Sequence, residues 1–142
     1  MKDKVLSGIG IAGLLLILFA AFPVAAEPTH DATVREIFRQ PFPDKPGTDT
    51  VMLTVEYGPG ASTPPHEHPG LTYAYVLEGA VISQVGDEKP KTFKRGQTWS
   101  ELPHQHHVIS KNASLTNPAK LLVFLIVPKD TPLLTMLPAK TP

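Results

Sequence analysis

Five of the six histidines of this 142-residue chain lie in two short groups whose spacing suits metal binding. His66 and His68 are two residues apart, so on a β-strand their side chains project from the same face. The second group, within residues 104–107, can supply a third imidazole from a neighbouring strand. Three imidazoles leave open positions on a metal for water or a small molecule. The sequence therefore predicts a divalent metal site built from three histidines.

Short β-strands separated by tight turns must position these histidines. Residues 51–57 alternate between apolar and polar side chains, which is the pattern of a strand with one buried face. Residues 72–77 and 80–85 are rich in strand formers, and the continuous apolar run at residues 121–127 is typical of a strand buried on both faces. Residues 33–38 fit either an edge strand or a short helix. Further short strands are expected at residues 92–93, 98–100 and 107–110.

This pattern predicts an all-β fold. The 16 prolines and 10 glycines are too many for a helical bundle, and they lie between apolar segments as turns between strands do. We therefore predict a single domain, an antiparallel β-barrel or jelly roll over residues 51–128. Residues 27–50 are expected to form a leader with an edge strand, and residues 129–142 a tail.

Residues 1–26 predict an export signal. A short charged start is followed by an almost unbroken apolar run at residues 5–22, and Val24-Ala25-Ala26 places small residues before a cleavage site at Glu27. The alternative is a retained membrane anchor, since the apolar run can nearly span a bilayer. Pro23 favours cleavage, because it breaks the helix directly before the small residues. We expect a periplasmic or secreted mature protein without stable membrane association.

Composition excludes several classes of function. The full chain has 13 basic and 13 acidic residues, and loss of Lys2, Lys4 and Asp3 with the signal leaves 11 and 12. A chain this close to neutral is not a general nucleic-acid binder. It has no cysteine, which excludes disulfides, thiolate metal sites and cysteine nucleophiles.

The first histidine pair lies in a pattern that resembles the first motif of the cupin family, G-x5-H-x-H-x3,4-E-x6-G. The chain keeps every spacing and every key residue of that motif except the glutamate, in the order Gly60, His66, His68, Thr72 and Gly79. Thr72 stands in the glutamate position.

The second cupin motif, G-x5-P-x-G-x2-H-x3-N, fits more loosely from Gly96 onward. Counting from that glycine places His107 in the histidine position and His104 in the second glycine position. Leu102 stands where the motif has proline, and Asn112 comes one residue late.

The resemblance covers residues 51–127 and implies a cupin-type barrel. In such a barrel, residues matching His66, His68 and His107 bind a divalent metal, which can be iron, manganese, zinc or nickel. A homodimer is also implied. A bulge in the last strand would allow His106 to replace His107, but the spacing from Gly96 favours His107.

The missing motif glutamate directs attention to another carboxylate. Glu101 precedes the second histidine group and can point into the barrel, as a replacement ligand or a catalytic base. An ion pair with Lys94 is the alternative role for Glu101. Three neutral histidines leave the full charge of the metal in place, which favours an anionic small-molecule ligand.

Other polar and aromatic residues carry weaker signals. We expect His104 to be a solvated loop residue and His30 to have no role. Gln84 fits equally an inward and a solvent-exposed position, whereas Tyr73 and Tyr75 are expected on the outer face of the barrel.

Three functions remain open at this stage. The first is a metal-dependent oxidoreductase that resembles a dioxygenase and acts on a small molecule. The second is a non-catalytic periplasmic module that binds a small ligand or a metal. The third is a metal-free structural cupin, since one barrel can host many activities.

Overall fold

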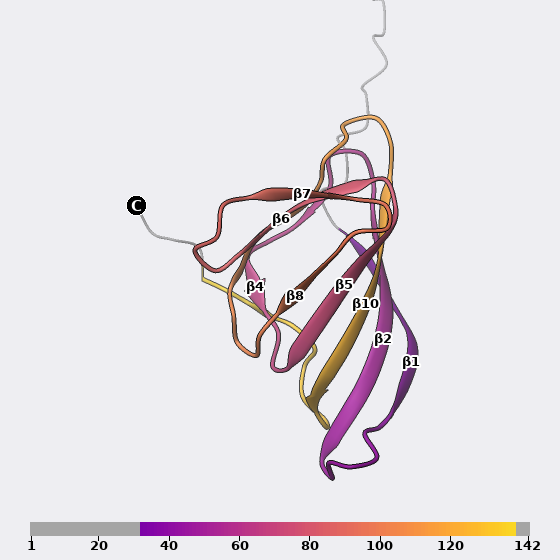
Figure 1. Ribbon diagram of the computed structural model, residues 1–142, viewed down its shortest axis with the longest axis vertical. Coiled ribbons are helices and arrows are strands. Elements are labelled where there is room, and N and C mark those ends of the chain that lie inside the picture. Colours follow the sequence, from indigo (N-terminus) through magenta and orange to yellow (C-terminus); the bar gives the residue numbers. More distant parts are fainter. Residues whose placement is uncertain (1–31, 139–142) are drawn as a thin grey trace, which may run out of the picture.

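The computed structural model describes residues 32–138, which form two antiparallel β-sheets (Figure 1). The first sheet has the order β1-β2-β10-β5-β8, formed by Thr33–Pro41, Thr48–Tyr57, Ala119–Pro128, Leu71–Glu78 and Thr98–Glu101. The second has the order β11-β4-β9-β6-β7, formed by Thr135–Met136, His66–Glu67, His107–Asn112, Ala80–Val85 and Lys91–Lys94, and β3 (Ser62–Thr63) pairs with β9. The predicted all-β antiparallel jelly roll is confirmed.

The core lies between the two sheets and is built by strand alternation. Odd-numbered residues of β2 and β10 point inward, and the buried apolar side chains on these two strands are Val51, Leu53, Val55, Tyr57, Ala119, Leu121, Val123, Leu125 and Val127. Full burial of a valine or leucine side chain contributes about 1.5–3 kcal/mol relative to exposure. This pair of strands therefore anchors the barrel.

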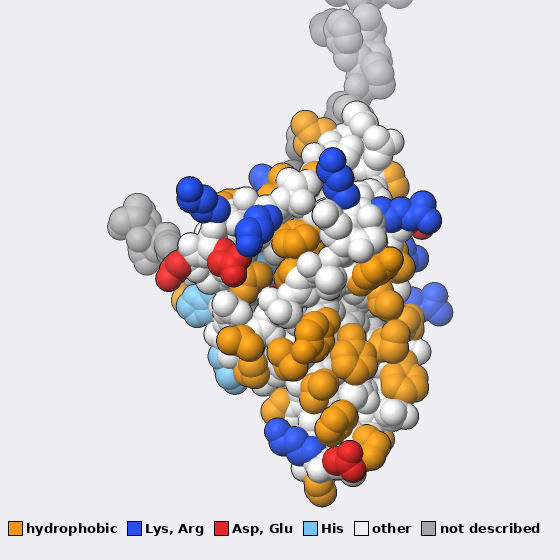
Figure 2. All heavy atoms as spheres, viewed as in Figure 1, with side chains coloured by type: hydrophobic (Ala, Val, Ile, Leu, Met, Phe, Trp, Pro, Cys, Tyr) orange, Lys and Arg blue, Asp and Glu red, His pale blue; other side chains and the backbone are white. Residues whose placement is uncertain are grey.

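The outer face of the five-stranded sheet is largely apolar, and no other element within residues 32–138 covers it. The prediction that residues 121–127 are buried on both faces is wrong, because Leu122, Phe124 and Ile126 point outward and are only partly buried. Tyr73 and Tyr75 lie on the same face and are 45% and 44% exposed, as predicted. Figure 2 shows hydrophobic side chains gathered over β2, β10 and β5 on this side of the molecule.

Both ends of the described chain join the sheets. The edge-strand alternative for residues 33–38 is confirmed, since they belong to β1 and pair with β2. Near the other end, β11 pairs with β4, so that Met136 lies opposite His66. No helix within residues 32–138 is long and apolar enough to cross a membrane. The predicted signal segment and His30 lie outside the described residues.

Gly79, the last glycine of the first motif, closes the β5–β6 hairpin. Its φ of +68° lies in the left-handed region, which glycine adopts without strain. A Cβ atom at this position would also lie 2.6 Å from the carbonyl oxygen of Pro118. The glycine therefore permits a close approach between this hairpin and the start of β10.

Candidate metal centre

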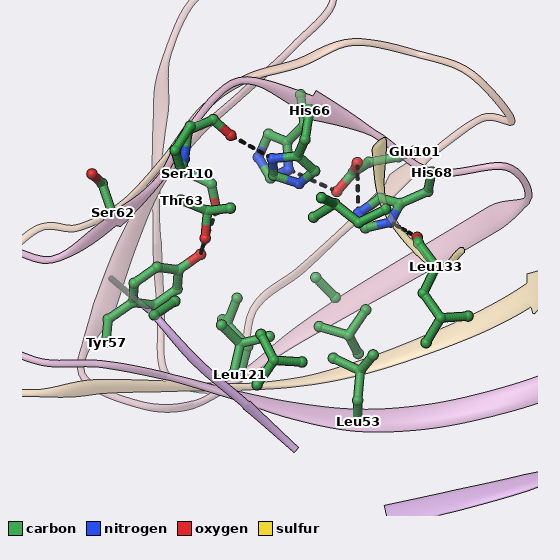
Figure 3. A pocket seen from close by; sticks show the side chains of 18 of the residues that line it. Leu53, Tyr57, Ser62, Thr63, His66, His68, Glu101, Ser110, Leu121 and Leu133 are labelled. Carbon is green, nitrogen blue, oxygen red and sulfur yellow. Dashed lines mark hydrogen bonds and ion pairs between the residues drawn. The ribbon is translucent and has the colours of Figure 1, made fainter. Parts of the chain in front are cut away.

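Four side chains that could bind a metal converge where the two sheets meet. His66 on β4, His68 just after it, Glu101 on β8 and His107 on β9 offer ligand atoms that all lie within 4.8 Å of one another (Figure 3). His66, Glu101 and His107 are each at most 4% exposed, and His68 is partly buried. The structure thus brings together the three predicted histidines and the predicted carboxylate.

Backbone carbonyls fix the orientation of two of these histidines. His66 Nδ1 lies 2.7 Å from the carbonyl oxygen of Pro64, and His68 Nδ1 lies 2.6 Å from that of Leu133. A carbonyl oxygen only accepts hydrogen bonds, so each Nδ1 carries the proton and donates it. Each Nε2 is therefore left with a free lone pair, which is the form that binds metals.

His107 is oriented by a different contact. Its Nε2 lies 2.8 Å from Ser83 Oγ, and its Nδ1 lies 3.2 Å from Glu101 Oε1. His107 Nδ1 and Glu101 Oε2 are nevertheless buried without a hydrogen-bond partner. Buried polar atoms are almost always paired in native proteins. A cation among the four side chains would satisfy both atoms, so the donor set fits a divalent metal.

Electrostatics leave His66 and Glu101 in metal-binding forms at neutral pH. Burial, with smaller effects from His107 and His68, lowers the pKa of His66 to about 4, so this imidazole is neutral. For Glu101, burial opposes ionisation, but the contacts with His107, His68 and Trp99 outweigh it and lower the pKa. The cluster therefore presents an anionic oxygen together with a neutral nitrogen donor.

Glu101 lies directly opposite the position where the motif glutamate is missing. Thr72 on β5 pairs in register with Glu101 on β8, and its side chain is 1% exposed. Directly opposed residues of an antiparallel pair have their side chains on the same face. The carboxylate thus enters the same part of the barrel from the neighbouring strand. The alternative of an ion pair with Lys94 is wrong, because Glu101 contacts His68, His107 and the Trp99 indole.

A β-bulge explains why the third histidine was ambiguous. Asn112 and Ser110 point inward on β9, and continued alternation would bring His106 inward. The register between β6 and β9 shifts near Val108, however, and His107 becomes the next inward residue. His106 is exposed, with its Nε2 3.8 Å from Glu67 Oε2.

The remaining residues named from the sequence lie outside the cluster. His104 is exposed as expected, and its Nδ1 lies 3.0 Å from Glu67 Oε1. It has a φ of +60°, in the left-handed region that favours glycine, and it stands where the motif has glycine. Gln84 points outward on β6. The neighbouring inward residue, Ser83, was missed, although its alternation with buried Val81 was a usable signal.

A cavity of about 510 Å³ opens from the cluster into the barrel. Its walls are mainly apolar and come from the inner face of the five-stranded sheet, with Trp99 beside the cluster. Leu133, Leu134 and Met136 of the C-terminal segment complete the lining. Sequence reasoning missed this segment because it has no alternating pattern.

Comparison with known proteins gives consistent matches. The cupin domain model matches residues 53–125. Auxin-binding protein ABP19b from Prunus persica is 32% identical over 101 residues, which cover 68% of this chain and 43% of that protein. The matched region thus spans less than half the length of this curated relative.

Solved structures share the fold at low sequence identity. A conserved protein with a double-stranded β-helix domain from Klebsiella pneumoniae has a TM-score of 0.60 at 16% identity, covering 78% of this chain and 88% of that one. Oxalate oxidase in complex with the substrate analogue glycolate has a TM-score of 0.59 at 18% identity, covering 77% of this chain and 56% of that one.

Proposed function

We propose that this chain, which belongs to the cupin family, holds one divalent metal ion among His66, His68, Glu101 and His107. The metal centre would act on a small molecule as an oxidoreductase of the dioxygenase type. The observation that carries the proposal is the pair of buried, unpartnered atoms, His107 Nδ1 and Glu101 Oε2, inside a cluster of four potential ligands.

Each residue of the cluster has a defined task in this proposal. His66 and His68 offer Nε2, because their Nδ1 protons are donated to carbonyl oxygens. His107 offers Nδ1, and Ser83 accepts the proton on its Nε2. Glu101 adds a negative charge that a set of three histidines lacks. Iron or manganese bound there would supply redox chemistry with dioxygen, and zinc or nickel would supply Lewis acidity.

The cavity supports an amphiphilic acid as the small molecule. Its walls are mainly apolar, and none of the described residues that line it is lysine or arginine. An anionic group entering the cavity therefore finds its positive partner at the metal. The apolar part of the ligand would leave water and pack against the surrounding valine and leucine side chains.

Oxygen consumption tests the oxidoreductase proposal. Protein loaded with Fe²⁺ or Mn²⁺ is offered a panel of small keto, enol and hydroxy acids, and the protein with Glu101→Gln and His107→Ala serves as the control. Acid-dependent oxygen uptake by the unaltered protein alone supports the proposal. Metal-dependent binding of these acids without any turnover would contradict it.

Metal-dependent binding of acids without turnover is the result expected of a non-catalytic binding module. One observation favours this alternative. Glu101 is the only carboxylate among the described residues that line the cavity, and it belongs to the metal cluster. No second carboxylate therefore remains to transfer protons. The curated relative is also named for binding rather than for catalysis.

We also propose export and self-association. Export rests on residues 1–26, and mass measurement of exported protein should give a chain that begins at Glu27. Self-association rests on the outer sheet face, where Phe38, Met52, Phe124 and Tyr73 form a row across four paired strands. The row carries no charge, so a second copy of the same surface meets it without repulsion.

A further inference from the structure

Three hydroxyl groups form a hydrogen-bonded chain in the cavity wall. Tyr57 Oη lies 2.9 Å from Thr63 Oγ1 and 2.8 Å from Ser110 Oγ. Tyr57 ends β2, Thr63 lies on β3 and Ser110 lies on β9, and all three line the cavity. Tyr57 is 2% exposed and Ser110 is 4% exposed. A buried polar group of this kind lies within a wall that is otherwise mainly apolar.

One of the three hydroxyl protons is not used in a hydrogen bond between the hydroxyl groups. The three hydroxyls carry three protons, and the two hydrogen bonds between them use only two. Within residues 32–138, Thr63 Oγ1 and Ser110 Oγ make no other side-chain hydrogen bond. Burial raises the pKa of Tyr57, so the phenol stays protonated at neutral pH. The group is therefore a hydrogen-bond donor without an acceptor.

The spare donor lies within reach of a molecule held at the metal position. Ser110 is the next inward-facing residue after His107 on β9, so the strand rise keeps their backbones at most about 10 Å apart. Figure 3 shows Tyr57 and Thr63 at one end of the cavity and Glu101 and His68 at the other.

We propose that the Thr63–Tyr57–Ser110 hydroxyl chain is a second contact point of the cavity and selects acids whose apolar body carries a carbonyl or ether oxygen. The inference rests on the proposed function, which places the acid group at the metal. The oxygen accepts the spare proton, and the apolar walls enclose the carbon chain between the two contacts. Burying a ligand oxygen without such a donor is unfavourable, so the hydroxyl chain discriminates between acids of equal length.

The hydroxyls also join β2, β3 and β9, and this structural role makes a different prediction. A structural link affects the stability of the protein and leaves its preference among ligands unchanged. Thr63→Val and Ser110→Ala each remove one hydroxyl with little change in shape. Ser62→Ala is the matched control, because Ser62 lines the same cavity without belonging to the hydroxyl chain.

Calorimetric titration of the Zn²⁺-loaded protein separates these roles. The probes are decanoate and a series of oxodecanoates in which the keto group moves one carbon at a time along the chain. We expect at least one keto acid to bind about fivefold more tightly than decanoate. That advantage should disappear in whichever of Thr63→Val and Ser110→Ala removes the hydroxyl that faces the ligand, and it should persist in Ser62→Ala. The affinity for decanoate should be the same in all of them.

The other outcomes identify which idea fails. Metal-dependent binding of decanoate with no preference for any keto acid would overturn the inference and leave the metal site in place. A preference that survives in both hydroxyl variants would overturn it as well. If chelation of the metal leaves the binding of these acids unchanged, the orientation assumed in the proposed function is wrong and both proposals fall.

Discussion

Thr72 and Glu101 face each other across the paired strands β5 and β8, so the carboxylate of the barrel stands one strand away from its motif position. This relationship predicts that the carboxylate can be exchanged between the two positions. Glu101→Gln should weaken metal binding more than tenfold, and adding Thr72→Glu to that variant should restore most of the affinity. Zinc titration against a chelating dye measures both effects.

Glu78→Gln is the matched control for that exchange, because Glu78 belongs to β5 but lies outside the cluster. Its metal affinity should equal that of the unaltered protein. Thr72→Glu alone should tighten metal binding and weaken the binding of small carboxylates, since it adds a second negative charge. Unchanged affinities in both Thr72 variants would show that position 72 does not face the metal.

Single alanine substitutions distinguish the clustered histidines from the exposed ones. His66→Ala, His68→Ala and His107→Ala should each lower metal affinity at least tenfold, because each removes one nitrogen donor. His104→Ala and His106→Ala should leave the affinity unchanged, because both side chains are exposed and contact Glu67 instead. A large loss in His106→Ala would show that the bulge on β9 is misplaced.

Ser83 is expected to act as a positioning residue for His107. Removal of its hydroxyl in Ser83→Ala frees the imidazole to rotate, and loss of such an orienting contact typically costs tenfold or more in metal affinity. Gln84→Ala, on the outward side of the same strand, is the control and should have no effect. Equal affinities of Ser83→Ala and the unaltered protein would remove Ser83 from the site.

Acid should destabilise the metal-free protein through His66. The folded-state pKa of His66 is lowered from 6.5 to about 4, so the unfolded chain takes up the proton first as the pH falls. Stability should therefore decrease from pH 6.5 downward, by up to about 3 kcal/mol near pH 4. Urea unfolding with a chelator present measures this loss, and His66→Phe should reduce it between pH 6.5 and 5.

The outer row of the five-stranded sheet predicts the behaviour of the protein in solution. Tyr73→Lys places a charge at one end of the row and should convert a dimer to a monomer in analytical ultracentrifugation. Leu115→Lys is the control, because Leu115 is 83% exposed on a loop and lies outside the row. A monomeric unaltered protein would contradict the proposed self-association.

Local patterns were enough to predict the parts of this site that follow regular alternation. The His66–His68 pair and the alternating side chains of β2 depend only on neighbours along the chain, and both lie where the pattern placed them. Glu101 needed one further step, because its inward direction depends on its pairing with β5.

The features that were not predicted depend on contacts between distant segments. The bulge near Val108 is defined by the pairing of β9 with β6, so alternation alone left His106 and His107 as competing ligands. The contact from Leu133 to His68 joins residues 65 positions apart. The partner of His68 is a backbone carbonyl group, and every residue has one. The sequence around Leu133 therefore contains no local pattern that predicts this contact.

That same contact sets an order of events during biosynthesis. A chain made from its N-terminus presents His66 and His68 to solvent well before the segment around Leu133 leaves the ribosome. Until that segment is in place, the imidazole of His68 can rotate, and the cavity lacks one of its walls. If the proposed metal binds, its high-affinity capture would therefore begin only when the segment around Leu133 is in place. If the chain is also exported, as we propose, this delay would leave the choice of metal to the compartment where folding ends.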